Sequence, residues 1–238
     1  MLSKKKDIWI VISLCVLAFY IIFMIYPLGI LFKNAVIENN GNFTFAYFSK
    51  FLSKNYYFST IFNSFKVSLA ATALTLIIGT PLAYFYNMYK IKGKTFLQII
   101  IILCSMSAPF IGAYSWILLL GRNGLITNTL KNLTGFNVPS IYGFGGILLV
   151  LCMQLYPLVF LYVSGALRNI DNSLLEASEN MGCTGTKRFF KIIIPLCIPT
   201  ILAAALMVFM RAFADFGTPL FIGEGYRTFP VEIYNQFM

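Results

Sequence analysis

The sequence is 238 residues long; 59% of them are hydrophobic, 11% are charged, and the mean hydropathy is +0.80. This composition excludes an ordinary water-soluble enzyme and is typical of proteins that cross a membrane several times. The formal net charge of +10 does not indicate nucleic-acid binding, because the basic residues stand at the ends of apolar runs instead of along one polar face. We therefore predict an all-α polytopic membrane protein whose surroundings are a lipid bilayer, with no nucleic-acid partner.

Five cysteines are present and histidine is absent. Four cysteines lie in apolar runs and one lies in a polar segment, and no two of them have Cys-x-x-Cys spacing. Neither a zinc site nor a disulfide framework has the residues that it needs. The sequence therefore predicts no resident metal and no cofactor.

Five apolar segments are long enough to cross a hydrocarbon core of about 30 Å at about 1.5 Å per helical residue. They cover residues 8–32, 61–87, 96–120, 145–167 and 192–213. The first segment follows Lys4-Lys5-Lys6, as in a signal peptide, but it is too long and lacks a small-residue cleavage site. We expect it to remain as an uncleaved transmembrane helix.

The basic residues between these segments predict the orientation. With a cytoplasmic amino terminus, ten Lys and Arg lie on the inner side and six on the outer side, as the positive-inside rule requires. The inner residues are Lys4, Lys5, Lys6, Lys90, Lys92, Lys94, Arg168, Lys187, Arg188 and Lys191, and the outer ones are Lys33, Lys50, Lys54, Arg122, Lys131 and Arg227.

Residues 33–60, which follow the first span, are rich in aromatic side chains. Phe45, Phe48, Phe51 and Leu52 have helical spacing after Thr44, which favours a helix along the outer membrane interface. We therefore divide the chain into residues 1–60, the first transmembrane helix with this interfacial segment, and residues 61–238, which hold the other spans.

Small and hydroxyl side chains recur every four residues in the second span, as at Ser64, Ser68 and Thr72. Such faces let membrane helices approach one another closely. We expect this span to lie in the interior of the bundle.

The polar segment 168–192 lies between the fourth and fifth spans. Ser173 and Glu176 have the spacing of a capping box, and Gly182 is a natural left-handed helix end. A second short helix is expected to start near Thr184 or Thr186 and to run into the fifth span. The sequence thus predicts a helix, a glycine corner and a basic helix on the cytoplasmic side.

This segment resembles the cytoplasmic loop of the inner-membrane permeases of binding-protein-dependent ABC importers. The family pattern is Glu-Ala-Ala, three residues, Gly, nine residues, Ile-x-Leu-Pro. Here Glu176-Ala177-Ser178, Gly182 and Ile192-Ile193-Ile194-Pro195 keep every spacing. Ser178 and Ile194 depart from the pattern by small changes of volume. The resemblance covers roughly residues 60–238.

The resemblance implies a MetI-like fold with a six-helix core, of which this chain would supply five helices and lack the sixth, as a fragment or as a part that a second permease subunit completes. It implies a protein of the bacterial plasma (inner) membrane that is not itself an enzyme. Residues 172–182 would form the coupling helix, with Glu176, Ala177, Ser178 and Gly182 at the interface with a separate ATP-binding subunit dimer. An extracytoplasmic solute-binding protein would deliver the solute.

Arg211 and Asp215 stand four residues apart at the outer end of the fifth span. We expect them to share a helix face, as an interfacial ion pair or as part of the substrate pathway. The stretch from Arg211 to Gly223 resembles permeases for ferric iron, 2-aminoethylphosphonate and polyamines, and its Asp-Phe-Gly is most similar to the ferric-iron group. The resemblance therefore implies transport of ferric iron, with the other two solutes as alternatives.

Asn63-Ser64 resembles the Asn-Ser or Asn-Thr pair with which the core of these permeases commonly begins.

Two other classes of protein agree less well with the sequence. An ion-coupled secondary carrier would hold ionisable residues near mid-membrane, whereas the charges here lie near the ends of the spans. A membrane enzyme would need a catalytic set, and Glu176 with Glu179 has no nucleophile or metal ligand nearby. Gly93-Lys94-Thr95 lacks the earlier glycine of a phosphate-binding loop, so no ATP site is predicted in this chain.

Overall fold

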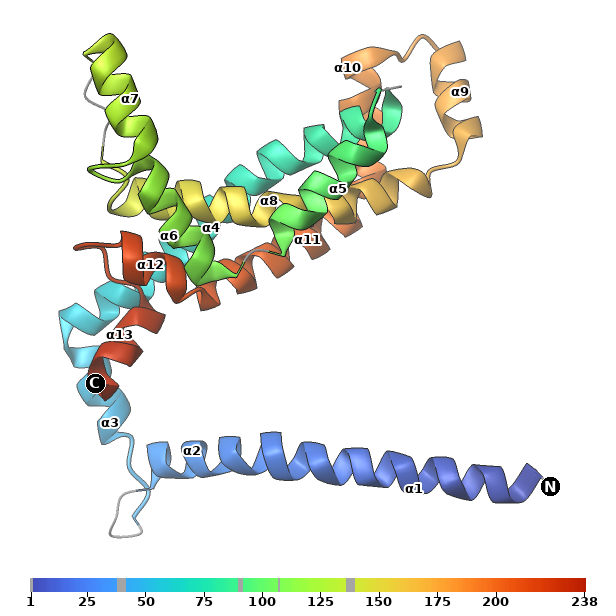
Figure 1. Ribbon diagram of the computed structural model, residues 1–238. Coiled ribbons are helices and arrows are strands. Elements are labelled where there is room, and N and C mark those ends of the chain that lie inside the picture. The colour runs from blue at the N-terminus through green and yellow to red at the C-terminus, as the bar shows by residue number, and fades with distance from the viewer. Residues whose placement is uncertain (1, 38–41, 90–91, 107, 136–139) are drawn as a thin grey trace. The chain divides into compact units, whose positions relative to one another are not determined.

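The computed structural model describes residues 2–37, 42–89, 92–106, 108–135 and 140–238 (Figure 1). Lys90, one of the basic residues that predict the orientation, lies outside them. Apart from an isolated β-bridge between Ile37 and Phe43, the described residues form helices and their connections, which confirms the all-α prediction. The chain divides into two compact units, Met1–Phe58 and Ser59–Met238.

The first unit consists mainly of one long helix. It comprises α1 (Leu2–Tyr20), a π-helical turn (Ile21–Ile25) and α2 (Tyr26–Val36), and it is followed by the short helix α3 (Ala46–Ser53). The π-helical turn comes directly before Pro27, and the Tyr26 N–H donates to the Ile21 carbonyl. Because proline has no N–H and its ring crowds the preceding turn, the wider turn accommodates it without ending the helix.

The second unit contains most of the remaining helices. They are α4 (Asn55–Met88, which begins before the boundary), α5 (Lys94–Ser105), α6 (Pro109–Leu120), α7 (Leu125–Thr134), α8 (Phe144–Arg168), α9 (Asn172–Asn180), α10 (Gly185–Arg188), α11 (Ile194–Ala214), α12 (Gly217–Ile222) and α13 (Phe229–Phe237). A second π-helical turn (Phe189–Ile193) joins α10 to α11, again just before a proline, Pro195. Figure 1 shows α9 and α10 at one end of this unit and α7, α12 and α13 at the other; we call these the α9 end and the α12 end.

Four of the five predicted spans are confirmed as single helical segments. Ile8–Val36, Asn55–Met88, Phe144–Arg168 and Gly185–Ala214 are each long and apolar enough to cross a membrane, and each contains one predicted span. The predicted third span over residues 96–120 is not one continuous helix. It consists of α5 and α6, and the helical stretch Pro109–Leu133 is bent by 105° from α5, as in a broken span or a re-entrant loop.

The break between α5 and α6 has a local cause. A proline disfavours helical backbone in the residue before it, and Ala108, which precedes Pro109, is extended with ψ at 139°. Pro109 itself begins α6, where its missing N–H costs no hydrogen bond. The apolar sequence therefore continues through this point while the helix does not.

The core of the second unit forms around α8. This helix packs against α5, α6, α11 and α12, and 56% of its most apolar stretch is buried. Val159, Phe160 and Val163 are among its fully buried side chains. Central burial on several sides explains why α8 is apolar around most of its circumference.

The spans α4 and α8 approach each other closely. A Cβ atom added at Gly79 would lie 2.8 Å from the Val159 Cβ and 3.1 Å from the Tyr156 carbonyl oxygen. Towards the α9 end, the Asn87 side-chain amide donates to the Ser164 hydroxyl over 2.8 Å. The hydroxyl face of α4 is buried, which confirms the prediction that this span is interior.

We expect Gly79→Ala to destabilise the second unit by about 1–3 kcal/mol, because the new methyl group must push α8 away. Gly165→Ala is the matched control, since nothing lies within 4 Å of a Cβ at that position in α8. The measurement is the apparent unfolding temperature of each purified variant in detergent. Equal unfolding temperatures for the two variants would contradict the close crossing.

Candidate functional site

The polar segment at the α9 end forms an elbow of two helices. The first of them, α9, is capped by Asp171, whose carboxylate accepts the Ser173 N–H over 3.0 Å. The prediction that Ser173 is the capping residue is therefore wrong. Asp171 lies one position ahead of the helix, and its side chain reaches an N–H group that the helix itself leaves unpaired.

Gly182 ends α9 in the left-handed conformation, as predicted, with φ at +74°. The Gly182 N–H donates to the Glu179 carbonyl and the Cys183 N–H donates to the Ser178 carbonyl, both over 2.9 Å. These two bonds are the Schellman motif, which satisfies carbonyl groups at a helix end. The corner is therefore closed by backbone bonds that require a residue tolerant of positive φ at Gly182.

The second helix of the elbow, α10, begins after Thr184 and continues through the π-helical turn into α11. The predicted start near Thr184 is thus confirmed. Arg188 on α10 lies 3.5 Å from the Glu179 carboxylate on α9, and its own side chain is only 20% exposed. This ion pair joins the two arms of the elbow.

The two faces of α9 differ. Leu175 packs against the core, and Ser178 is buried with its hydroxyl donating to the Leu175 carbonyl over 2.7 Å. Leu174, Ala177 and Met181 form an exposed apolar stripe at i, i+3 and i+7, and Met181 is 86% exposed. We call these three residues the α9 stripe.

Of the four predicted interface residues, three lie at the surface and one does not. Glu176, Ala177 and Gly182 are exposed, whereas Ser178 is turned towards the core. The sequence prediction did not include Leu174 and Met181. Their helical spacing within an otherwise polar connection is the signal that could have found them.

Arg211 and Asp215 lie at the α12 end of α11. The expected common helix face does not form, because α11 ends at Ala214 and Asp215 has extended backbone. The Asp215 carboxylate instead accepts the Thr218 N–H over 3.2 Å at the start of α12. Burial raises the pKa of the Asp215 carboxyl, while hydrogen bonds from Thr218 and Gly217 act against this shift. Arg211 is exposed and forms no ion pair with Asp215.

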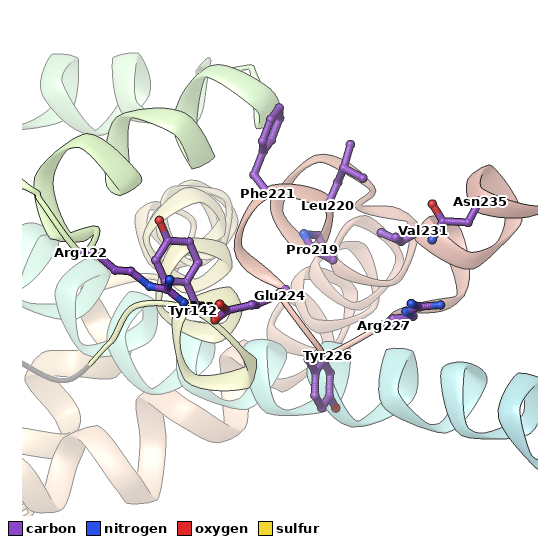
Figure 2. A pocket seen from close by; sticks show the side chains of 11 residues that line it. Arg122, Tyr142, Pro219, Leu220, Phe221, Glu224, Tyr226, Arg227, Val231 and Asn235 are labelled. Atoms are coloured by element: carbon purple, nitrogen blue, oxygen red, sulfur yellow. Dashed lines mark hydrogen bonds and ion pairs between the residues drawn. The ribbon is translucent and has the colours of Figure 1, made fainter. Parts of the chain in front are cut away.

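A polar cavity of about 460 Å³ also lies at the α12 end (Figure 2). The ion pair of Arg122 with Glu224 lines it, and so does Arg227, which pairs with Glu232 outside the lining. Figure 2 shows Arg122 beside Tyr142, whose ring lies 5.3 Å from the guanidinium carbon. The other lining residues come mainly from α12, α13 and the turn between them; they are Pro219, Leu220, Phe221, Gly223, Tyr226, Val231 and Asn235.

The turn between α12 and α13 is fixed to the first part of α4. The Asn63 amide donates to the Arg227 carbonyl over 3.1 Å, and the Phe229 N–H donates to the Ser64 hydroxyl over 2.7 Å. The Tyr226 hydroxyl donates to the Asn63 carbonyl over 3.3 Å. We call Asn63 and Ser64 the anchor pair, since they hold a segment more than 160 residues further along the chain.

A second cavity, of about 280 Å³, lies between α8 and the two helices of the bent pair. Neutral side chains line it: Cys104, Gly112, Ser115, Trp116, Val150, Met153, Gln154 and Tyr156. It therefore offers no carboxylate for a cation and no cationic group for an anion.

Long apolar helices around α8 and a helical elbow between two of them define the class of the protein, a multi-pass membrane protein. The chain belongs to the family of binding-protein-dependent transport system inner membrane components, whose model matches residues 75–238.

Relatives within the family differ in the solute for which they are named. The ferric transport system permease protein FbpB of Actinobacillus pleuropneumoniae is 28% identical over 98% of this chain and 34% of its own length. PhnU of Salmonella typhimurium, named for 2-aminoethylphosphonate transport, is 24% identical over 99% of this chain and 82% of its own length. The chain also spans 38% of a ferric permease from Haemophilus influenzae, so it covers little more than a third of either ferric relative.

A solved structure has the same fold. The bacterial alginate ABC transporter, in complex with a periplasmic protein that holds an alginate pentasaccharide, matches with a TM-score of 0.79 at 18% identity. The match covers 98% of this chain and 83% of that chain. The helical arrangement described above is therefore shared with a chain of this solved transporter.

We expect Ser64→Ala to destabilise the protein by about 1–3 kcal/mol, because it removes the acceptor of the Phe229 N–H from a partly buried site. Ser68→Ala is the matched control one helical turn away, where the hydroxyl bonds only to the Ser64 carbonyl of its own helix. The apparent unfolding temperature in detergent measures both. A drop for Ser68→Ala as large as that for Ser64→Ala would contradict the anchoring role.

Proposed function

We propose that this chain is a transmembrane subunit of an importer driven by a separate dimer of ATP-binding subunits. The elbow formed by α9 and α10 is the part that these subunits contact and move. The observation that carries the proposal is the exposed α9 stripe on a helix held rigidly between two spans. Isolated apolar residues are common on surfaces, but a helical stripe in a polar connection is the kind of face that a partner groove covers. Glu176 and Gly182 lie beside the stripe and complete the proposed interface.

The elbow can transmit movement because it is attached to the core on both sides. Leu175 packs on the core cluster, and Arg188 joins α9 to the helix that continues into α11. ATP binding and hydrolysis in the partner would shift α9, and α8 and α11 would tilt with it. A passage between this subunit and a second permease subunit would then open to each side of the membrane in turn.

The proposal also sets the orientation. With the α9 end in the cytoplasm, the amino terminus is cytoplasmic and the α12 end faces the solute-binding protein outside the membrane. Residues 61–238 are then the permease core, and residues 1–60 are an additional helix with its interfacial segment. Arg211 and Asp215, at the outer end of α11, are proposed to line the entrance of the substrate pathway.

Ferric iron is the solute that we propose. Two ferric permeases match 98% of the chain at 28% identity. Among the residues that the structure describes, no group of three or more His, Cys, Asp or Glu could hold a metal ion. Selection of the ion is therefore assigned to the binding protein. The phosphonate relative, which is matched over 82% of its length, supports 2-aminoethylphosphonate as the second candidate, and a polyamine is the third.

Disruption of the elbow is expected to abolish recovery of the ATP-binding subunit. Leu174→Glu and Gly182→Glu should each reduce the co-purified subunit by about ten-fold or more, since interface contacts of this kind contribute about 2 kcal/mol. The controls are Leu133→Glu, a similarly exposed leucine on α7, and Gly182→Asn, which keeps the left-handed corner. Unchanged recovery with both glutamate variants would contradict the proposed interface.

Transport measurements decide the solute. The full-length permease would be reconstituted in liposomes with its ATP-binding subunit, and ATP-dependent uptake would be followed with binding proteins loaded with ferric iron, 2-aminoethylphosphonate or spermidine. We expect uptake with ferric iron alone, and none when the binding protein is empty or ADP replaces ATP. Uptake of another solute without uptake of iron would overturn the iron assignment and leave the transporter assignment intact.

A further inference from the structure

The turn between α12 and α13 combines a strained residue with two attachments of different kinds. Glu224 has φ at +50° and is the only non-glycine residue with positive φ in the described part of the chain. Side chains with a Cβ atom rarely adopt this conformation, so surrounding contacts must hold Glu224 there. The contacts on its two sides therefore determine how readily the turn can move.

The attachment on one side consists of three hydrogen bonds and is partly buried. Ser64 is 2% exposed and Thr228, next to the residue that Ser64 binds, is 3% exposed, whereas the bond from Asn63 to Arg227 is exposed. The three hydrogen bonds of the anchor pair join the turn to α4, the helix that makes the close crossing with α8. Loss of the Ser64 hydroxyl would remove the acceptor of the Phe229 N–H from a partly buried site, which is costly.

The attachment on the other side is exposed. The side chains of Arg122 and Glu224 are 70% and 53% exposed, and they join the turn to the connection between α6 and α7. Exposed ion pairs stabilise a structure only slightly, and salt screens them. The ion pair is therefore an attachment of the turn that can be lost at little cost in free energy.

The cavity at the α12 end lies between these two attachments. Arg122 and Glu224 lie on one side of it, Arg227 and Tyr226 lie on another, and Val231 lines it while remaining 7% exposed (Figure 2). Residues 223–225 lie between two fixed points, because the Gly143 N–H donates to the Ile222 carbonyl over 2.8 Å and the anchor pair holds Tyr226 and Arg227. The ion pair with Arg122 holds this stretch through the Glu224 side chain. Its release would let residues 223–225 move and open the cavity.

We propose that Arg122 and Glu224 form a releasable latch, and that its opening lets residues 223–225 move away from the connection between α6 and α7 and exposes the cavity at the α12 end. The use of the latch rests on the proposed function: it keeps the outer side closed until the transport cycle opens it. Its geometry does not depend on that function.

The latch can be tested by the labelling rate of a buried reporter. In a cysteine-free full-length permease carrying Val231→Cys, in liposomes, a membrane-impermeant maleimide reports opening of the cavity. We expect Arg122→Glu and Glu224→Arg each to increase the labelling rate by about five-fold, and the double exchange to return it to within about two-fold of the parent. High salt should speed labelling of the parent and leave Glu224→Gln unchanged.

Two controls distinguish latch opening from general loosening. Asn235→Cys lines the same cavity but is already exposed, so its labelling rate should stay constant in every background. Lys131→Glu reverses an exposed charge on α7 and should not speed labelling at position 231.

The result that overturns the latch is a labelling rate at position 231 that is unchanged in both single variants or that stays high in the double exchange. Because labelling needs neither ATP nor solute, this outcome is independent of the transport test. In the assembled transporter, the single variants should also raise ATP hydrolysis without binding protein by about five-fold. Accelerated labelling without that rise would retain the latch and remove its proposed use.

Discussion

The second unit depends on the close crossing of α4 and α8 at Gly79. Between helices in lipid there is little hydrophobic driving force, so close packing and interhelical hydrogen bonds hold the spans together. Both kinds of contact meet on α4, which packs on α8 at Gly79, bonds it through Asn87, and carries the anchor pair near its other end. The same helix therefore supports the elbow at one end of the bundle and the turn at the other.

Local sequence predicted the features whose causes are local. Length and apolar content give four of the spans, and the preference of glycine for positive φ gives the corner at Gly182. The cap at Asp171 was missed because Ser173 matches a common spacing equally well, and the expected pairing of Arg211 with Asp215 failed because α11 ends between them. The bend of 105° after α5 was not predicted, because hydropathy does not change there and a proline in an apolar run does not determine an angle.

Contacts between distant segments could not be predicted from one sequence. The pair Asn63-Ser64 was noticed only as a resemblance, and its partners, Arg227 and Phe229, lie more than 160 residues away. Burial of Ser178 is a similar case. The pattern around it predicts a helix, but only the packed structure determines which face of that helix turns inward. The residues at the surface of the elbow are therefore a result of the tertiary structure.

The bend of 105° after α5 restricts which side of the protein can contact lipid. The Ile102 and Leu103 carbonyls near the end of α5 accept bonds from Ser105 and Met106, but a helix end leaves other carbonyl and N–H groups without partners in their own helix. Acyl chains cannot hydrogen-bond such groups, so non-helical backbone at membrane depth must be shielded from lipid by protein or by water. With the break at that depth, the side of the molecule at Ala108 would face protein or water, and annular lipid would contact other surfaces of the bundle.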